Sequence, residues 1–248
     1  MKTIFFVFLT IFCTKLGAQN SYELASPMPR ELPVKHTCFS LSYNEGYELP
    51  SWAAYKLTPE MAKASGTVKE KYDEDPMVTT GSSSTKDYRD AGFVMGQLVP
   101  VEDMTSDLKA ASETFLMSNV VPQKIGFNKY IWKVLERLVR EWAKEGNILY
   151  IAAGPVLTDA PFGTFGENKV AIPIRYYKVI CDVNGERAIG FLFRGNTSTG
   201  TLTSFAVTVD EIEKITGIDF FYTIQDDTEQ RLESSIDLSK WNFNALSQ

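Results

Sequence analysis

Histidine is nearly absent from this chain of 248 residues, and His36 is the only one. A mechanism that needs two imidazoles is therefore excluded, and one that needs a single imidazole has to use His36. The chain also lacks an excess of positive charge: its net charge is −6, which does not favour a broad nucleic-acid-binding surface. No apolar run is long enough to cross a bilayer.

The overall composition is that of an ordinary globular protein. Hydrophobic residues make up 44%, charged residues 23% and aromatic residues 12% of the chain. These values exclude disorder, collagen and coiled coil as the main state. The length suits one large domain or two small ones. Because no repeat or linker interrupts the chain, we expect a single domain over residues 36–248.

The first 18 residues have the pattern of a secretory signal peptide. Lys2 precedes a short apolar run over residues 4–12, and Gly17 and Ala18 supply small residues for cleavage. We therefore expect export to the periplasm, to the outer membrane or out of the cell. An extended arm, rich in proline, is expected to follow over residues 19–35.

Cleavage after residue 18 would remove Cys13 and leave two cysteines, Cys38 and Cys181. Outside the cytosol these two residues can pair. Both fall in expected strands, so two buried thiols are an equally good interpretation. The sequence leaves these alternatives open.

Hydrophobic periodicity outlines the elements of an α+β protein. The clearest helix is expected over residues 129–145, where Ile131, Leu135 and Leu138 share one face. Residues 58–90 are polar and rich in turn residues, which predicts a long loop. Strands are expected over residues 37–43, 52–57, 149–153, 174–182, 189–193 and 205–208, and short helices over 210–216 and 228–235.

Residues 87–136 carry the most informative motifs. They contain Gly-Phe-Val-Met-Gly-Gln-Leu-Val-Pro from Gly92 to Pro100, Met-Ser-Asn from Met117, Pro-Gln at Pro122, and an asparagine–tryptophan pair at Asn128 and Trp132. This order and spacing resemble the DNA/RNA non-specific endonuclease family, whose pattern is Asp-Arg-Gly-His-x-x-Pro, then Met-Ser-Asn-x-x-Pro-Gln, then an Asn-x-x-x-Trp helix start. The resemblance covers about residues 35–225.

The resemblance implies a ββα-metal nuclease fold, a twisted antiparallel sheet flanked by helices with the site on a hairpin–helix unit. It also implies metal-assisted hydrolysis of phosphodiester bonds. In that chemistry the motif histidine activates water, and a divalent cation and arginines neutralise charge on the phosphate. By this resemblance Asn128 is the metal ligand and would hold Mg²⁺ or Mn²⁺. Glu136 supports the metal's water shell, and Asn119 shapes the site.

The first motif departs from the family pattern. Val94 stands at the aspartate position, Met95 at the arginine position and Gln97 at the general-base histidine position, whereas Gly96 and Pro100 agree with the pattern. The arginine that the family has further upstream is also missing, because residues 57–87 contain none. A neutral amide cannot accept a proton near neutral pH, and loss of a general base costs about 10²–10⁴ in rate.

Each matching residue also has a structural explanation. Asn128 could be only a helix N-cap. Glu136 could be a solvated or salt-bridged helix residue, and Gln97 a hydrogen-bonding residue in the former pocket. His36 has no motif around it, so we expect a surface or strand-edge residue that cannot replace the base.

Because of these departures from the family pattern, three candidate functions have to be compared. The one most favoured is a pseudo-nuclease, in which catalysis is lost and the surface binds another protein of the cell envelope. The alternative is a weak metal-dependent endonuclease that relies on Asn128 and Glu136. A module that binds nucleic acid without cutting it is disfavoured by the acidic charge.

Overall fold

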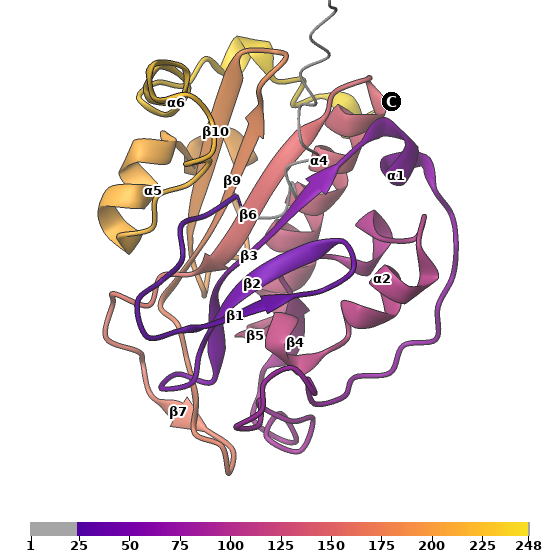
Figure 1. Ribbon diagram of the computed structural model, residues 1–248, viewed down its shortest axis with the longest axis vertical. Coiled ribbons are helices and arrows are strands. Elements are labelled where there is room, and N and C mark those ends of the chain that lie inside the picture. The colour runs from indigo at the N-terminus through magenta and orange to yellow at the C-terminus, as the bar shows by residue number, and fades with distance from the viewer. Residues whose placement is uncertain (1–23, 248) are drawn as a thin grey trace, which may run out of the picture.

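The computed structural model describes residues 24–247, so the leader expected over residues 1–18 lies outside the described residues. Seven antiparallel strands form the main sheet in the order β1-β2-β3-β6-β9-β10-β11 (Figure 1). The expected α+β class is confirmed. The strands of the sheet are β1 (Leu32–Lys35), β2 (Phe39–Asn44), β3 (Leu49–Leu57), β6 (Leu149–Pro155), β9 (Arg175–Asp182), β10 (Arg187–Arg194) and β11 (Ala206–Val207).

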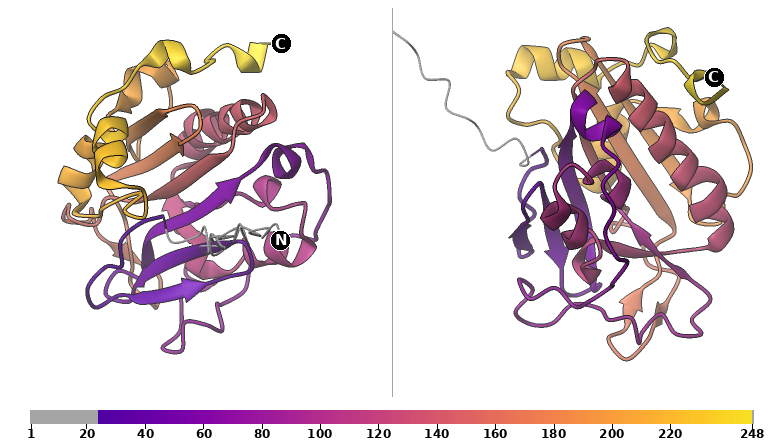
Figure 2. Two further views of the ribbon diagram at one scale, coloured as in Figure 1. Left: turned by 45° about the horizontal axis from the view of Figure 1, so that its top comes forward. Right: turned by 90° about the vertical axis from the view of Figure 1, so that its right-hand side faces the viewer.

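Helices cover both faces of this sheet, as Figure 2 shows. The long helix α4 (Lys133–Lys144) lies on one face together with α1 (Pro59–Lys63) and α2 (Leu108–Glu113). The other face carries α5 (Val209–Thr216) and α6 (Asp226–Glu233). Because side chains alternate along each strand, every central strand contributes to two hydrophobic cores.

The two cores separate the two cysteines of the described chain. Cys38 packs against the core on the α4 face, with Tyr55 and Leu135. Cys181 belongs to the core on the α5 face, with Val179 and Ile212. Cys38 and Cys181 therefore do not form a disulfide with each other. Of the two alternatives, a disulfide or two thiols, the structure shows thiols.

A smaller unit beside the sheet carries the nuclease-like motifs. Strand β4 (Val94–Gln97) pairs with β5 (Val120–Gln123) in antiparallel register, with Gln97 opposite Val120. The helix that follows begins with α3 (Ile125–Phe127), passes through a π-helical turn (Asn128–Trp132) and continues as α4. This arrangement is the hairpin–helix unit that the family resemblance implies.

Several boundaries differ from those expected. The segment expected as an extended arm over residues 19–35 ends in β1, which is the edge strand paired with β2. Residues 58–90 lack strands, as expected, but α1 occupies their first turn. Helix α2 was not expected, and neither was the short hairpin of β7 (Thr164–Phe165) and β8 (Val170–Ala171). Short 3₁₀ turns complete the chain at Val101–Asp103, Met117–Asn119, Leu202–Phe205, Leu238–Lys240 and Ala245–Ser247.

Within residues 24–247, no helix has both the length and the apolar character that a membrane span requires.

The packing of α4 on the sheet gives a direct stability test. Leu135 is completely buried in the core on that face. We expect Leu135→Ala to lower the free energy of unfolding by about 2–5 kcal/mol, because it removes apolar contacts and leaves a cavity. The measurement is chemical denaturation followed by circular dichroism. Arg137→Ala, at an exposed position of the same helix, is the control and should change stability by less than about 0.5 kcal/mol.

Candidate functional site

A small cavity lies between the β4–β5 hairpin and the start of the long helix. Its volume is about 30 Å³, enough for one water-sized group. Five residues of the resemblance meet around it, from the hairpin and from the helix. The lining residues are Tyr72, Met95, Gln97, Glu102, Asn128, Trp132, Lys133 and Glu136.

The Gln97 side chain is held by three hydrogen bonds. Its Nε2 donates to the carbonyl oxygen of Thr114 at 2.9 Å and lies 3.1 Å from Thr114 Oγ1. Its Oε1 accepts from the backbone N–H of Val101 at 3.4 Å. The amide is thus fixed at the edge of the cavity as a structural hydrogen-bonding group, and it has no basic nitrogen.

Asn128 lies inside the helix and is not its N-cap. Its backbone is helical (φ −55°, ψ −52°), and Lys124 occupies the N-cap position. The cap-only interpretation is therefore wrong, since the helix begins at Ile125, four residues earlier than expected. Asn128 opens the π-helical turn, and such turns occur frequently at functional sites.

The Asn128 side chain has the right atom available for a cation. Its Nδ2 donates to Gln123 Oε1 at 2.7 Å. This bond uses the amide nitrogen and leaves Oδ1 without a hydrogen-bond donor among residues 24–247. Glu102 and Glu136 supply carboxylates around the same cavity. Amide and carboxylate oxygens are the donors that Mg²⁺ and Mn²⁺ prefer, so the donor atoms present fit a divalent ion.

Met95 occupies the place that the family gives to an arginine. It is half-buried and packs with Tyr72 and Phe93 against a small apolar cluster. It offers no positive charge to the cavity. Among the lining residues Lys133 is the one cation, against the carboxylates of Glu102 and Glu136. The cavity therefore has no surplus of positive charge with which to attract a phosphate.

Beneath the cavity lies a layer of buried charged groups. Arg140 Nη1 donates to Asp103 Oδ1 at 2.8 Å, and the Tyr55 hydroxyl donates to Asp103 Oδ2 at 2.6 Å. Burial raises the pKa of Glu136, and the Lys178 ammonium opposes that rise. Burial in turn lowers the pKa of Lys178. Glu136 is buried beside charged groups. The alternative in which it is a solvated residue on the helix surface is therefore excluded.

Asn119 is fully buried and does not line the cavity. Its Nδ2 donates to the carbonyl oxygens of Val99 and Thr114, both at 2.9 Å, and its Oδ1 accepts from the backbone N–H of Val99 at 3.0 Å. These bonds connect the segment before β5 to Val99, which follows β4, and to the end of α2. Asn119 therefore shapes the site from behind.

Three lining residues were not expected from the sequence: Tyr72, Glu102 and Lys133. Lys133 follows Trp132 and lies one helical turn before Glu136, so the helical spacing could have indicated it. Tyr72 and Glu102 come from a loop and a 3₁₀ turn, for which the sequence carries no periodic signal.

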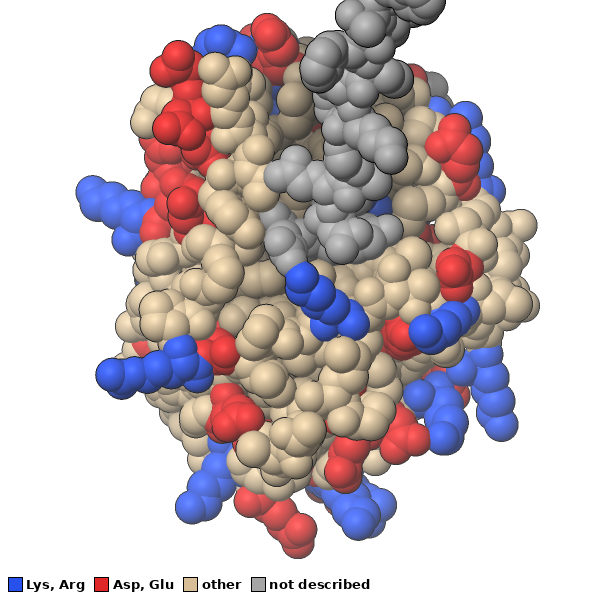
Figure 3. All heavy atoms as spheres, viewed as in Figure 1, with Lys and Arg blue, Asp and Glu red and all other residues tan. Residues whose placement is uncertain are grey.

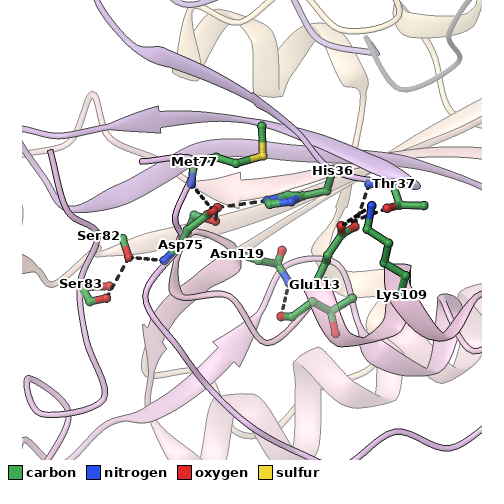
Figure 4. A network of polar contacts seen from close by, with 11 residues as sticks. His36, Thr37, Asp75, Met77, Ser82, Ser83, Lys109, Glu113 and Asn119 are labelled. Carbon is green, nitrogen blue, oxygen red and sulfur yellow. Dashed lines mark hydrogen bonds and ion pairs between the residues drawn. The ribbon is translucent and has the colours of Figure 1, made fainter. Parts of the chain in front are cut away.

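The single histidine lies in a different polar network, shown in Figure 4. His36, in the turn between β1 and β2, has a side chain only 2% exposed, and its Nε2 lies 3.1 Å from Asp75 Oδ2. Asp75 also accepts from the Ser118 hydroxyl. Glu113 accepts from the backbone N–H and the hydroxyl of the neighbouring Thr37. His36 is a strand-edge residue as expected, though with a buried imidazole, and it does not line the cavity.

Comparison with known proteins agrees with this architecture. A sequence model described as DNA/RNA non-specific endonuclease matches residues 19–227. Nuclease C1 from Cunninghamella echinulata var. echinulata is 32% identical over 206 residues, which cover 76% of this chain and 82% of that protein. The mitochondrial nuclease EXOG of Homo sapiens is 28% identical over 224 residues, which cover 83% of this chain and 61% of that protein.

A solved structure shares the fold. A chain in the crystal structure of the EndoG/EndoGI complex superposes with a TM-score of 0.71 at 24% identity, covering 79% of this chain and 88% of that chain. The hairpin–helix unit beside an antiparallel sheet is the ββα-metal nuclease fold. The chain belongs to the DNA/RNA non-specific endonuclease family. That family consists of nucleases that depend on a divalent metal ion.

The Asp75 network predicts an acid-sensitive contribution to stability. Burial alone would raise the pKa of Asp75, but hydrogen bonds from His36, Ser118 and the backbone N–H of Met77 outweigh it and hold that pKa below its ordinary value. A lowered carboxyl pKa stabilises the fold above the unfolded pKa of about 3.9, and this stabilisation is lost as the pH falls through the folded pKa.

We therefore expect Asp75→Asn to cost about 1–3 kcal/mol of unfolding free energy at pH 7. The difference from the wild type should shrink below about pH 4, where Asp75 itself becomes protonated. Urea denaturation between pH 3 and pH 8 measures both quantities. Glu74→Gln, at an exposed neighbouring position, is the control and should leave the wild-type curve unchanged. A difference that stays constant with pH would contradict the assignment.

Proposed function

We propose that this chain is a pseudo-nuclease, a protein with the nuclease fold that no longer hydrolyses phosphodiester bonds at a useful rate. The observation that carries the proposal is the environment of Gln97. Its amide stands at the general-base position and is fixed by Thr114 and Val101. An amide cannot take a proton from water, and His36 belongs to a separate network.

Electrostatics at the cavity support the same proposal. A phosphodiester carries a negative charge, and its transition state needs positive groups in fixed positions. Met95 supplies none, and Lys133 is a single ammonium without the bidentate fork of an arginine. Loss of one such donor costs about 10²–10³ in rate, although separate losses need not multiply.

A second candidate, a weak divalent-metal-dependent endonuclease acting on DNA and RNA, has one observation in its favour. Asn128 Oδ1 and the carboxylates of Glu102 and Glu136 surround a cavity of one-ion size. A bound Mg²⁺ or Mn²⁺ would lower the pKa of water and neutralise phosphate charge. Asn128 would hold the ion, and Glu136 would order its water shell. Gln97 could not take up the proton from that water, so this candidate would rely on a carboxylate of the cavity such as Glu136, whose pKa burial raises to about 7.

We further propose that the protein is exported and that its partner is another protein of the cell envelope. Export is supported by the leader pattern over residues 1–18. A protein partner is favoured over nucleic acid because the net charge is −6 and the cavity lacks arginine. Crosslinking in the producing cell, followed by mass spectrometry, tests both statements.

The activity prediction is that purified protein degrades plasmid DNA and RNA at or near the background rate in Mg²⁺ or Mn²⁺. The physical reason is the absence of a base at Gln97. Nuclease C1 serves as the active control. Strong wild-type cleavage that Asn128→Ala abolishes would refute the pseudo-nuclease and establish the second candidate.

Restoration provides the complementary test. We expect Gln97→His combined with Met95→Arg to cleave faster than the wild type, because a positioned base alone supplies about 10²–10⁴ in rate. In Gln97→His, the Thr114 carbonyl oxygen can accept one ring N–H and leave the other nitrogen as the base. Adding Asn128→Ala should remove the gain. If the gain survived that third substitution, Asn128 would not be the ligand.

A further inference from the structure

Three carboxylates from two helices meet on the face of the sheet opposite α4. Asp210 and Glu213 lie one turn apart on α5, and Glu233 is the last residue of α6. One oxygen from each carboxylate lies within 4.8 Å of the other two. Figure 3 shows acidic side chains gathered over α5 and α6, at the upper left of the view. None of these residues lines the cavity at Asn128.

The innermost of the three carboxylates has an unsatisfied oxygen. Glu233 is only 5% exposed, and its Oε1 is inaccessible to solvent and has no hydrogen-bond partner in the described chain. Glu213 Oε1 accepts from the backbone N–H of Phe220 at 2.6 Å, so its second oxygen remains for another partner. A buried acceptor without a partner is rare in folded proteins and calls for a ligand or a proton.

No positive side chain compensates this cluster. Within residues 24–247, none of the three carboxylates forms an ion pair with a lysine or arginine. Burial, together with Glu213, Glu229, Asp210 and Asp219, raises the pKa of Glu233 to about 9. These carboxylates therefore repel one another when all of them are ionised.

We propose that Asp210, Glu213 and Glu233 bind one divalent cation, and that Ca²⁺ is the ion that fits best. All the donors are carboxylate oxygens, which are ligands of hard cations. Oxygens on opposite sides of a Ca²⁺ ion are about 4.6–5.2 Å apart, so one such ion can reach oxygens that lie within 4.8 Å of one another. Ca²⁺ also accepts irregular and bidentate carboxylate geometry, whereas Mg²⁺ requires a near-ideal octahedron. The ion would join α5 to α6 and hold both helices on the sheet.

Thermal unfolding of the full protein with and without Ca²⁺ tests this site. With three protein carboxylates we expect a dissociation constant of about 10⁻⁴–10⁻³ M, the range of extracellular calcium modules. At 10 mM CaCl₂ the wild-type Tm should then rise by about 3–10 °C. Isothermal titration should give one Ca²⁺ per chain. Glu233→Gln and Asp210→Asn should each remove most of the shift, and Glu211→Gln, on the same helix outside the cluster, should retain it.

The Asn128→Ala variant separates this site from the nuclease cavity. It should keep the full Ca²⁺ response, whatever the outcome of the activity tests. The proposal would be overturned if Asn128→Ala lost the Ca²⁺ response, or if Glu233→Gln and Asp210→Asn responded as strongly as the wild type. It would also be overturned if 10 mM Ca²⁺ did not shift the wild-type Tm. A response to Mg²⁺ without one to Ca²⁺ would overturn the assignment of the ion.

Discussion

The packing of Trp132 between the helix and the hairpin is the interaction on which the candidate site depends. The residue ends the π-helical turn, is almost fully buried, and donates from Nε1 to the carbonyl oxygen of Gln97 at 3.1 Å. Its ring contacts Phe127 and Tyr176, and the Lys178 ammonium lies 4.7 Å from its centroid. These contacts fix the start of the helix against both β4 and the main sheet. Asn128 and Gln97 therefore line one cavity, although they lie 31 positions apart in the sequence.

Most of the fold could be predicted because its central elements are long and regularly patterned. The apolar stripe through Leu135 identified the helix, and the strands buried on both faces appeared as near-continuous hydrophobic runs. The elements that were missed are short. In β1, Pro33 argued against a strand, but an edge strand tolerates proline because one side of its backbone needs no partner. Helix α2 is less than two turns long, too short for a clear hydrophobic period, and it is capped by Asp107, whose side chain accepts from two backbone N–H groups.

The candidate site could be predicted only in part, because a family pattern supplies positions and not surroundings. It placed Gln97 and Asn128 together, yet it gave no indication of the Lys178 ammonium among the buried charges under Glu136. The sequence by itself also left open a cap-only role for Asn128, which the earlier helix start and the π-helical turn exclude. Such features depend on tertiary packing between segments far apart in the chain. The carboxylate cluster on α5 and α6 has the same origin, since Glu233 joins it only through the fold.

Four of the motif positions form two groups in this structure: two that agree with the family pattern support the fold around the hairpin, and two that depart from it line the cavity. Gly96 agrees with the family pattern, and a Cβ there would lie 2.4 Å from the side chain of Gln123, so glycine leaves room for the group that accepts from Asn128. Asn119 also agrees with the pattern, and its three hydrogen bonds hold the segment that follows β4 and the end of α2. The positions that depart from it, Met95 and Gln97, lie at the cavity, where the family's chemistry needs charge and a base. Gly96 and Asn119 thus support the nuclease architecture, whereas Met95 and Gln97 are the two positions on which the proposed loss of hydrolysis depends.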